Sequence, residues 1–399
     1  MYYVAETESL IADGVITETQ ADEIKSRARG AMVALFVNTL LIAGILAATL
    51  GLVFLLASAV SVAVCGGLFL LAGLLILRYS PPLYRMFGNA SAMIGAGMLI
   101  SGTGIELIDK QPDVAGWWLM VIGALIAVFC IWRFKAAAPH LRFAYGAVLL
   151  MSGALHVVGL YYGVSHAEIS GWQMPFVHFY IFAVIAGCGL FLDIRFVTAL
   201  AIVPFAQMLD TGTYYFTAAY VFYSPEPTVS ILQMSALIGA CLWAANRFGG
   251  SVARQTGILA IMAFIVASLC FLVGSIWGDV VGETWWGPVY ADFDDYARYH
   301  EARDAFRASA LTIHEHVYSV VWAALLAGMV LWAAIGNRRG LFNAAMTFAG
   351  IHAYTQMFET FHNEPLAYVV GGLAAIPLAF GLWRLNNAWF KPMDVAGTQ

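Results

Sequence analysis

Residues 32–77 decide the fold: MVALFVNTLLIAGILAATLGLVFLLASAVSVAVCGGLFLLAGLLIL, with no charged residue between Arg29 and Arg78. A helix that crosses the hydrocarbon core of a bilayer, about 30 Å thick, needs about 20 consecutive apolar residues. The stretch is long enough for two such helices. We therefore predict membrane spans at 33–57 and 59–78.

The composition of the whole chain supports the same interpretation. Of its 399 residues, 61% are hydrophobic and only 11% are charged, whereas a soluble domain carries roughly 25% charged residues. Such a chain cannot cover itself with polar surface, so we expect the lipid bilayer to be its solvent. The net charge of −5 and the lack of a basic tract argue against nucleic-acid binding.

Similar apolar runs recur along the chain and predict an all-α integral membrane protein, a polytopic bundle of about 12 transmembrane helices. The spans are expected near 33–57, 59–78, 87–106, 115–133, 141–162, 175–193, 195–209, 229–247, 255–277, 312–336, 340–360 and 366–384. The seventh is short and contains Pro204. The five cysteines fall inside apolar runs, which predicts no disulfides.

The distribution of Lys and Arg predicts the orientation. With an even number of spans and the N-terminus in the cytoplasm, only Lys110, Arg298, Arg303 and Arg307 fall outside, out of 19 basic residues. Cytoplasmic loops of membrane proteins are enriched in Lys and Arg. We therefore expect a multi-pass protein of the bacterial inner membrane with both termini in the cytoplasm.

Residues 31–390 are expected to form the transmembrane bundle. Three segments are expected outside the bilayer, and one of them is a loop of this bundle. Residues 1–30 predict a cytoplasmic helical hairpin, with Gly14 ending its first helix and Thr17 and Gln20 forming a capping box that opens its second. The outer loop 278–310 carries charges at helical spacing over 292–307 and predicts a surface helix. Residues 391–399 form a cytoplasmic tail.

Two motifs at the ends of the chain carry a family resemblance. The element ESLIADGVITETQADEI (8–24) stands directly before a glycine-rich pair of spans, and NRRGLFNAAMTFAGIHAYTQMFETF (337–361) is followed by VVGGLAAIPLAFGLWRL (369–385). Together they resemble bacterial membrane proteins of the domain-of-unknown-function 2157 family and its 4401 relatives. The resemblance implies a multi-pass membrane protein and supplies no catalytic residues.

The histidines suggest a site on the outer side, where every histidine except His140 is expected. His352, Glu359 and His362 lie at the outer end of the eleventh span, and His314 and His316 at the start of the tenth. Together these five residues are our candidate metal ligands. His314 and His316 can share a metal only if the helix is unwound there, because residues two apart on a helix point about 200° from each other.

The alternative for every histidine is an amphipathic residue at the membrane interface, bonded to a neighbour or to water; a pH-sensing role is a third interpretation. A zinc protease motif HExxH is excluded, because Tyr318 stands where its second His would be. The histidines could hold a metal or a haem-like group; otherwise the cofactor is unknown, and none is the first expectation.

The remaining polar residues in or near spans have structural interpretations. We expect Asn38 and Gln233 to form hydrogen bonds between helices, and Asp193 to pair locally with Arg195. Glycines such as Gly95, Gly97, Gly102 and Gly104 permit close helix approach.

Three functions remain open. The first is a non-enzymatic scaffold or sensor whose N-terminal hairpin docks a cytosolic partner. The second is a carrier for a small neutral or apolar solute. The third is a metal-binding or redox membrane protein that uses the outer histidines. No catalytic residue is identified, so an enzyme is not favoured.

Overall fold

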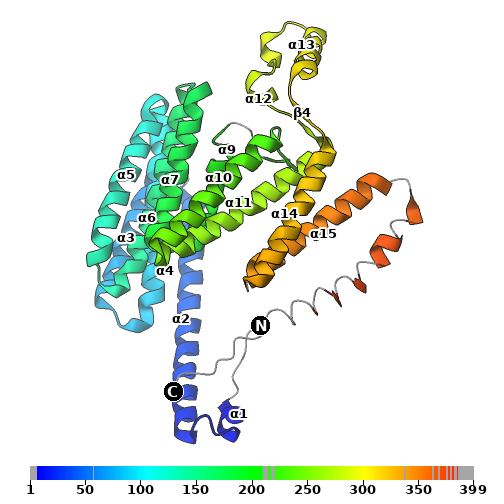
Figure 1. Ribbon diagram of the computed structural model, residues 1–399. Coiled ribbons are helices and arrows are strands. Elements are labelled where there is room, and N and C mark those ends of the chain that lie inside the picture. The colour runs from blue at the N-terminus through cyan, green and yellow to red at the C-terminus, as the bar shows by residue number, and fades with distance from the viewer. Residues whose placement is uncertain are drawn as a thin grey trace. The chain divides into compact units, whose positions relative to one another are not determined.

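The computed structural model describes residues 7–56, 58–209, 214–216, 221–336 and 338–361, and short pieces between 364 and 384. The chain forms two compact units, residues Met1–Ile169 and Ser170–Gln399. Helices account for most of both units (Figure 1).

The first unit consists of helices joined by short turns. They are α1 (Thr7–Ala12), α2 (Glu18–Leu56), α3 (Ala59–Tyr79), η1 (Pro82–Tyr84), α4 (Arg85–Lys110), α5 (Pro112–Ala136) and α6 (Pro139–His166). The most extensive packing joins α3 to α4 and α5 to α6, so two antiparallel helix pairs form its centre.

The second unit contains more non-helical structure. Its elements are η2 (Gly171–Gln173), α7 (Met174–Leu192), α8 (Arg195–Leu200), α9 (Ile202–Gln207), β1 (Tyr214–Phe216), β2 (Val221–Tyr223), α10 (Pro227–Phe248), α11 (Gly250–Trp277), β3 (Asp279–Val280), α12 (Glu283–Trp286), η3 (Tyr290–Asp292), α13 (Tyr296–Ser309), β4 (Thr312–Ile313), α14 (Glu315–Ile335) and α15 (Arg339–Phe361). Strands β1 and β2 pair antiparallel with Tyr214 opposite Tyr223, and β3 pairs antiparallel with β4.

The helices are those of a multi-pass membrane protein. Within the part of the chain that the structure describes, nine helices are long and apolar enough to cross a membrane: α2, α3, α4 with η1, α5, α6, α7 with η2, α10, α11 and α14. Their outward side chains are apolar; Leu68, Leu125 and Phe54, for example, are exposed. In water such surfaces would aggregate, whereas in a bilayer the apolar hydrocarbon chains of the lipid surround them.

The N-terminal hairpin differs from the prediction in one respect. Helix α1 ends before Gly14, which has a φ of 69°, and the capping box is present: Gln20 N donates to Thr17 Oγ1 at 3.3 Å and Thr17 N to Gln20 Oε1 at 3.0 Å. The expected second short helix is not separate. It is the beginning of α2, a single 39-residue helix about 58 Å long at 1.5 Å per residue.

Close glycine contacts hold the helix pairs of the first unit together. A Cβ atom added to Gly95 of α4 would lie 2.2 Å from the backbone nitrogen of Leu70 in α3, and one added to Gly116 of α5 would lie 2.3 Å from that of Gly163 in α6. The helix backbones therefore touch directly, which small residues make feasible in lipid. Gly97 and Gly104, which the sequence placed in the same class, have more room.

Two polar residues form the expected links between helices. Asn38 of α2 is 1% exposed; its Nδ2 donates to the carbonyl of Leu83 at 2.7 Å, and its Oδ1 accepts from Phe87 N at 3.0 Å. Gln233 of α10 donates from Nε2 to the carbonyl of Phe205 in α9. Both bond to backbone groups near the ends of helices, where backbone pairing within the helix is incomplete; the carbonyl of Phe205 also accepts from Met208 N at 3.2 Å.

The expected seventh span, 195–209, is not one helix. It consists of α8 and α9, separated at the fully buried Ala201. Its two ends nevertheless lie at opposite ends of α11. Asp193 accepts hydrogen bonds from Arg254 and Gln255 at the start of α11, whereas the carbonyl of Leu209 accepts from Trp285 Nε1, beyond the end of α11, at 2.8 Å.

Asp193 does not pair with Arg195 as expected. It ends α7 in a left-handed conformation, with a φ of 55°, and its Oδ2 accepts from Arg254 Nη2 at 2.5 Å. Hydrogen bonds from Arg254, Gln255 and Ser251 hold the pKa of its carboxyl at about 2. The left-handed turn directs the side chain toward α11 rather than along its own chain.

The last two expected spans have different outcomes. The eleventh corresponds to α15, which is helical throughout but is not among the nine helices that are long and apolar enough to cross a membrane. The twelfth, 366–384, falls largely outside the described residues.

The glycine contacts give a first prediction. We expect Gly95→Ala to destabilise the protein by about 3 kcal/mol, because its methyl group would meet backbone that cannot move aside. Gly97→Ala is the matched control on the same helix, since the nearest atom to its added carbon, Met151 Cε, is 4.0 Å away. Thermal unfolding in detergent measures both; equal midpoints would contradict the packing.

Candidate functional site

The second unit carries a cluster of polar residues where α11 ends and α14 begins. Strand β3 follows α11 and pairs with β4, so that Asp279 lies opposite Ile313. The turn between α11 and β3 requires Gly278, whose φ is 67° and whose added Cβ would lie 2.8 Å from the carbonyl oxygen of Ile313. The strand pair thus brings the ends of two long helices together.

Asp279 is the centre of this cluster. It is 5% exposed, and its Oδ2 accepts hydrogen bonds from Thr228 N at 3.0 Å, from Tyr318 Oη at 3.1 Å and from the hydroxyl of Thr228. Its other oxygen, Oδ1, is buried without a hydrogen-bond partner among the described residues. One carboxylate therefore joins the starts of α10 and α14 to the end of α11.

A second buried carboxylate lies close by. Glu226 is 1% exposed and accepts from the backbone nitrogens of Gly282, at 2.9 Å, and Thr284, at 2.8 Å. Burial raises the pKa of Glu226, and the charge of Asp279 adds to the rise, while the two backbone donors oppose it. Glu226 thus fixes the turn that leads into α12.

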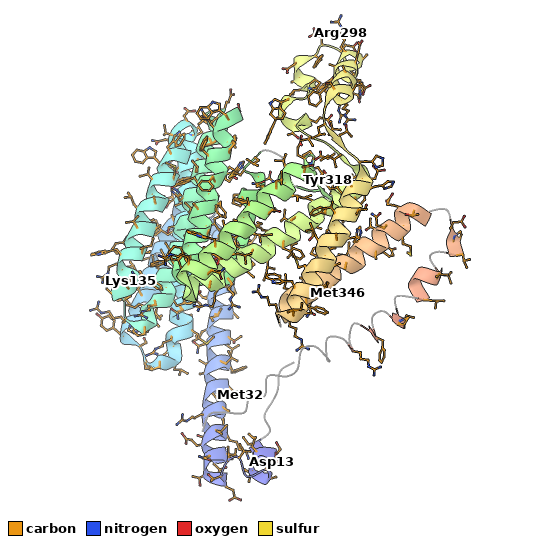
Figure 2. The ribbon with its side chains drawn as sticks, viewed as in Figure 1. Asp13, Met32, Lys135, Arg298, Tyr318 and Met346 are labelled. Atoms are coloured by element: carbon orange, nitrogen blue, oxygen red, sulfur yellow. The ribbon has the colours of Figure 1, made fainter. Side chains whose placement is uncertain are left out.

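The segment between β3 and β4 forms a lobe held by an ion-pair cluster. Glu283 of α12 accepts from Arg303 Nε at 2.6 Å and from Arg307 Nε at 2.8 Å, both in α13. Burial raises the pKa of Glu283, but the two arginines outweigh it, so the net pKa lies below the usual value. Arg298 marks the far end of this lobe and Tyr318 lies near its base (Figure 2).

The structure brings two of the five predicted metal ligands together, along with a third residue. His314, Glu315 and His316 each offer one ligand atom, and these atoms all lie within 4.8 Å of one another. Helix α14 begins at Glu315, and His314 precedes it in an extended conformation. The helix is therefore absent at His314, which was the condition that the sequence set for a shared site.

The other predicted ligands are placed differently. The ring of His352 lies against Trp322, with centroids 4.8 Å apart, and Trp322 is eight residues along α14 from His314, about 12 Å away. Helices α14 and α15 lie close together at the turn that joins them. They diverge toward the start of α14 and the end of α15 (Figure 1). The three-residue group includes neither His352 nor Glu359, and His362 lies outside the described residues.

Two further histidines are hydrogen-bonded to neighbouring residues, as the interpretation of the histidines as structural residues expects. His156 in α6 is 7% exposed, and its Nδ1 lies 2.7 Å from the carbonyl of Met120 in α5, so this nitrogen carries the proton. His166, at the end of α6, lies 3.0 Å from a carboxylate oxygen of Asp113. Both make links within the first unit.

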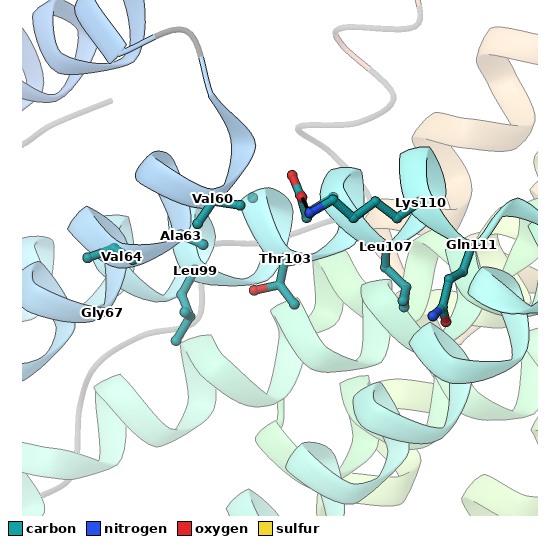
Figure 3. Close-up of a pocket in the computed structure, with 11 residues that line it drawn as sticks. Val60, Ala63, Val64, Gly67, Leu99, Thr103, Leu107, Lys110 and Gln111 are labelled. Carbon is teal, nitrogen blue, oxygen red and sulfur yellow. Dashed lines mark ion pairs between the residues drawn. The ribbon is translucent and has the colours of Figure 1, made fainter.

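The first unit contains an open groove of about 440 Å³ between α3 and α4. Val64 and Leu99 line one end of it, Thr103 lies near the middle, and Lys110 lies toward the other end (Figure 3). Lys110 is paired with Glu106, which also lines the groove. Its lining is mainly apolar. A carrier of neutral solutes would need a polar-lined cavity at mid-depth, and this groove does not have that lining.

The sequence did not single out Asp279, Glu226 or Tyr318. Asp279 was one of many acidic residues in an outer loop, and Tyr318 was noted only because it breaks the HExxH motif. The sequence holds one weak signal for Asp279, which directly follows Gly278 at the end of an apolar run. At such a place the chain can turn, and an acidic side chain can then bond to the ends of neighbouring helices.

The fold and this site define a class: an all-α, multi-pass membrane protein with a small lobe held on buried carboxylates. No family model, no curated protein and no solved structure matches the chain.

Asp279 gives a second prediction. Asp279→Ala removes the acceptor that the hydroxyls of Thr228 and Tyr318 share. Because these two hydroxyls can then bond only to each other, one of them loses its acceptor, and we expect the change to lower stability by about 3 kcal/mol. Tyr318→Phe removes one donor and leaves the carboxylate two others, so we expect a loss of about 1 kcal/mol. Unfolding in detergent compares them; a larger effect of the tyrosine change would contradict the central role of Asp279.

Proposed function

We propose that the chain is a non-enzymatic scaffold or sensor of the bacterial inner membrane that docks a cytosolic partner on its N-terminal hairpin. The observation that carries this proposal is a groove with exposed apolar residues among polar ones, on a segment joined to the membrane by one continuous helix. The proposal includes membership in the family that the two end motifs resemble.

The proposal requires twelve crossings and a cytoplasmic N-terminus. Three features support this topology. Nine helices suit spans by length and composition, α8 and α9 connect regions near opposite ends of α11, and α15 with the apolar segment 366–384 supplies two more. The distribution of Lys and Arg then orients the protein.

Cysteine labelling tests the topology in the full chain. We expect Ala291→Cys to react with a membrane-impermeant maleimide in intact cells and Asn246→Cys to react only after lysis. Ala167→Cys, before the broken segment, is the control and reacts from outside. If α8 and α9 do not cross the membrane, Asn246→Cys reacts in intact cells and Ala291→Cys reacts only after lysis. The control at Ala167 still reacts from outside.

The docking groove lies where the hairpin folds back on α2. It is about 670 Å³ in volume, and its lining includes Val15, Ile16 and Ile24. Val15 is 66% exposed and Ile24 is 45% exposed. Because α2 has about twice the length that a bilayer core needs, these residues stand outside the hydrocarbon region, where exposed apolar side chains mark an interaction surface.

The charges around the groove indicate the partner's chemistry. The charged residues that line the groove, Glu23 and Arg27, are paired at 2.6 Å. Four more acidic residues are exposed on the same segment outside the lining: Glu8, Asp13, Glu18 and Asp22. An amphipathic helix with an apolar face and a basic flank complements this surface.

Photo-crosslinking in the native membrane tests the docking. A crosslinking amino acid at Val15 is expected to capture one discrete polypeptide, and Ile24→Glu to abolish the capture by placing a charge in the groove. Lys25→Glu, outside the groove, preserves it, and a crosslinker at Leu35, on the membrane part of α2, does not yield the same adduct. Mass spectrometry identifies the captured segment.

Two results would contradict the proposal. One is capture that persists with Ile24→Glu, because it would not depend on the groove. The other is a captured segment that lacks an apolar helix face with basic residues.

A further inference from the structure

We propose that His314, Glu315 and His316 bind one divalent transition-metal ion of the Zn²⁺ class. This site is independent of the N-terminal hairpin. It differs from the site expected from sequence, since it uses three consecutive residues and draws nothing from α15.

The backbone makes the site feasible. On a continuous helix, side chains two residues apart point in nearly opposite directions. His314, however, has φ −70° and ψ 147°, an extended conformation that continues β4, and α14 begins only at the next residue. The two imidazole rings therefore lie on the same side, with centroids 4.8 Å apart.

The distances suit a metal after small side-chain rotations. His314 Nδ1 and Glu315 Oε2 are 3.2 Å apart, close to the separation of about 3.3 Å that follows for two ligands held tetrahedrally at about 2.05 Å from zinc. The widest separation in the group is 4.8 Å, so the remaining ligand must move inward by about 1.5 Å. Both histidines are exposed. Binding of the ion through His314 Nδ1 replaces the long hydrogen bond, 3.5 Å, that this nitrogen accepts from His316 N.

The donor set points to the class of ion. Two imidazoles and one carboxylate are ligands of zinc and copper, and three protein ligands leave a coordination position open to water. The positive end of the α14 helix dipole opposes the ion, but this effect is small beside three direct bonds. Glu315 supplies a compensating negative charge within the site.

Metal binding here would have a structural consequence. The three residues span the junction between β4, which anchors the lobe of residues 283–309, and α14. An ion bound to all three would hold the first turn of α14 against the end of the strand. The geometry thus makes the lobe's attachment responsive to metal.

The test uses the purified full chain in detergent. Zn²⁺ is titrated against a chromophoric chelator, and Co²⁺ serves as a spectroscopic probe because its visible bands intensify on tetrahedral coordination. We expect one equivalent to bind with a Kd of micromolar order. His314→Asn, which keeps an acceptor at the N-cap, and His316→Ala should each weaken binding by about 100-fold, and Glu315→Gln by about tenfold.

His166→Ala is the matched control, because His166 is also an exposed histidine beside a carboxylate. It should leave the stoichiometry and affinity unchanged. Unaltered affinity in both His314→Asn and His316→Ala, or Co²⁺ bands that remain weak and octahedral in the wild type, would overturn the site. Binding lost only in His166→Ala would place the ion elsewhere and overturn it equally.

Discussion

The bilayer imposes the constraint on which the rest of this structure depends: a backbone N–H or C=O group in hydrocarbon must find its partner within the protein. The long helices satisfy it internally. Where a helix is broken, polar side chains lie at the break. Gln255 accepts from Thr198 at 2.7 Å and donates to Asp193 at 2.6 Å, and Asn38 serves the start of α4. Irregular backbone is thus accompanied by buried polar groups.

The two units meet this constraint with different packing. In the first, glycines bring helix backbones into contact, and stability comes from van der Waals contact over long surfaces. In the second, aromatic rings fill the space between α11, α14 and α15: Phe271 stacks on Trp322 with ring planes 7° apart, and Phe264 meets Phe348 edge to face. The second unit therefore packs these helices through large side chains rather than through contact of their backbones.

The elements that the sequence predicted well are those set by local signals. Apolar length located the long helices, and the capping box at Thr17 and Gln20 needs only residues three apart. The partner of Asp193 depended on a left-handed turn and on a helix 61 residues away. Similarly, the backbone at His314 is extended because it continues β4, and β4 pairs with β3 on the other side of the lobe. No periodicity in residues 312–316 reveals this pairing.

The unbroken helix α2 also makes the hairpin sensitive to the thickness of the membrane. A helix whose apolar stretch exceeds the local hydrocarbon thickness responds to hydrophobic mismatch by tilting, commonly by about 20°. The part of α2 before Met32 extends the span by about 20 Å, so this tilt would displace the groove sideways by about 7 Å. A flexible linker would absorb such a motion, whereas a rigid helix converts lipid composition into the position of the hairpin.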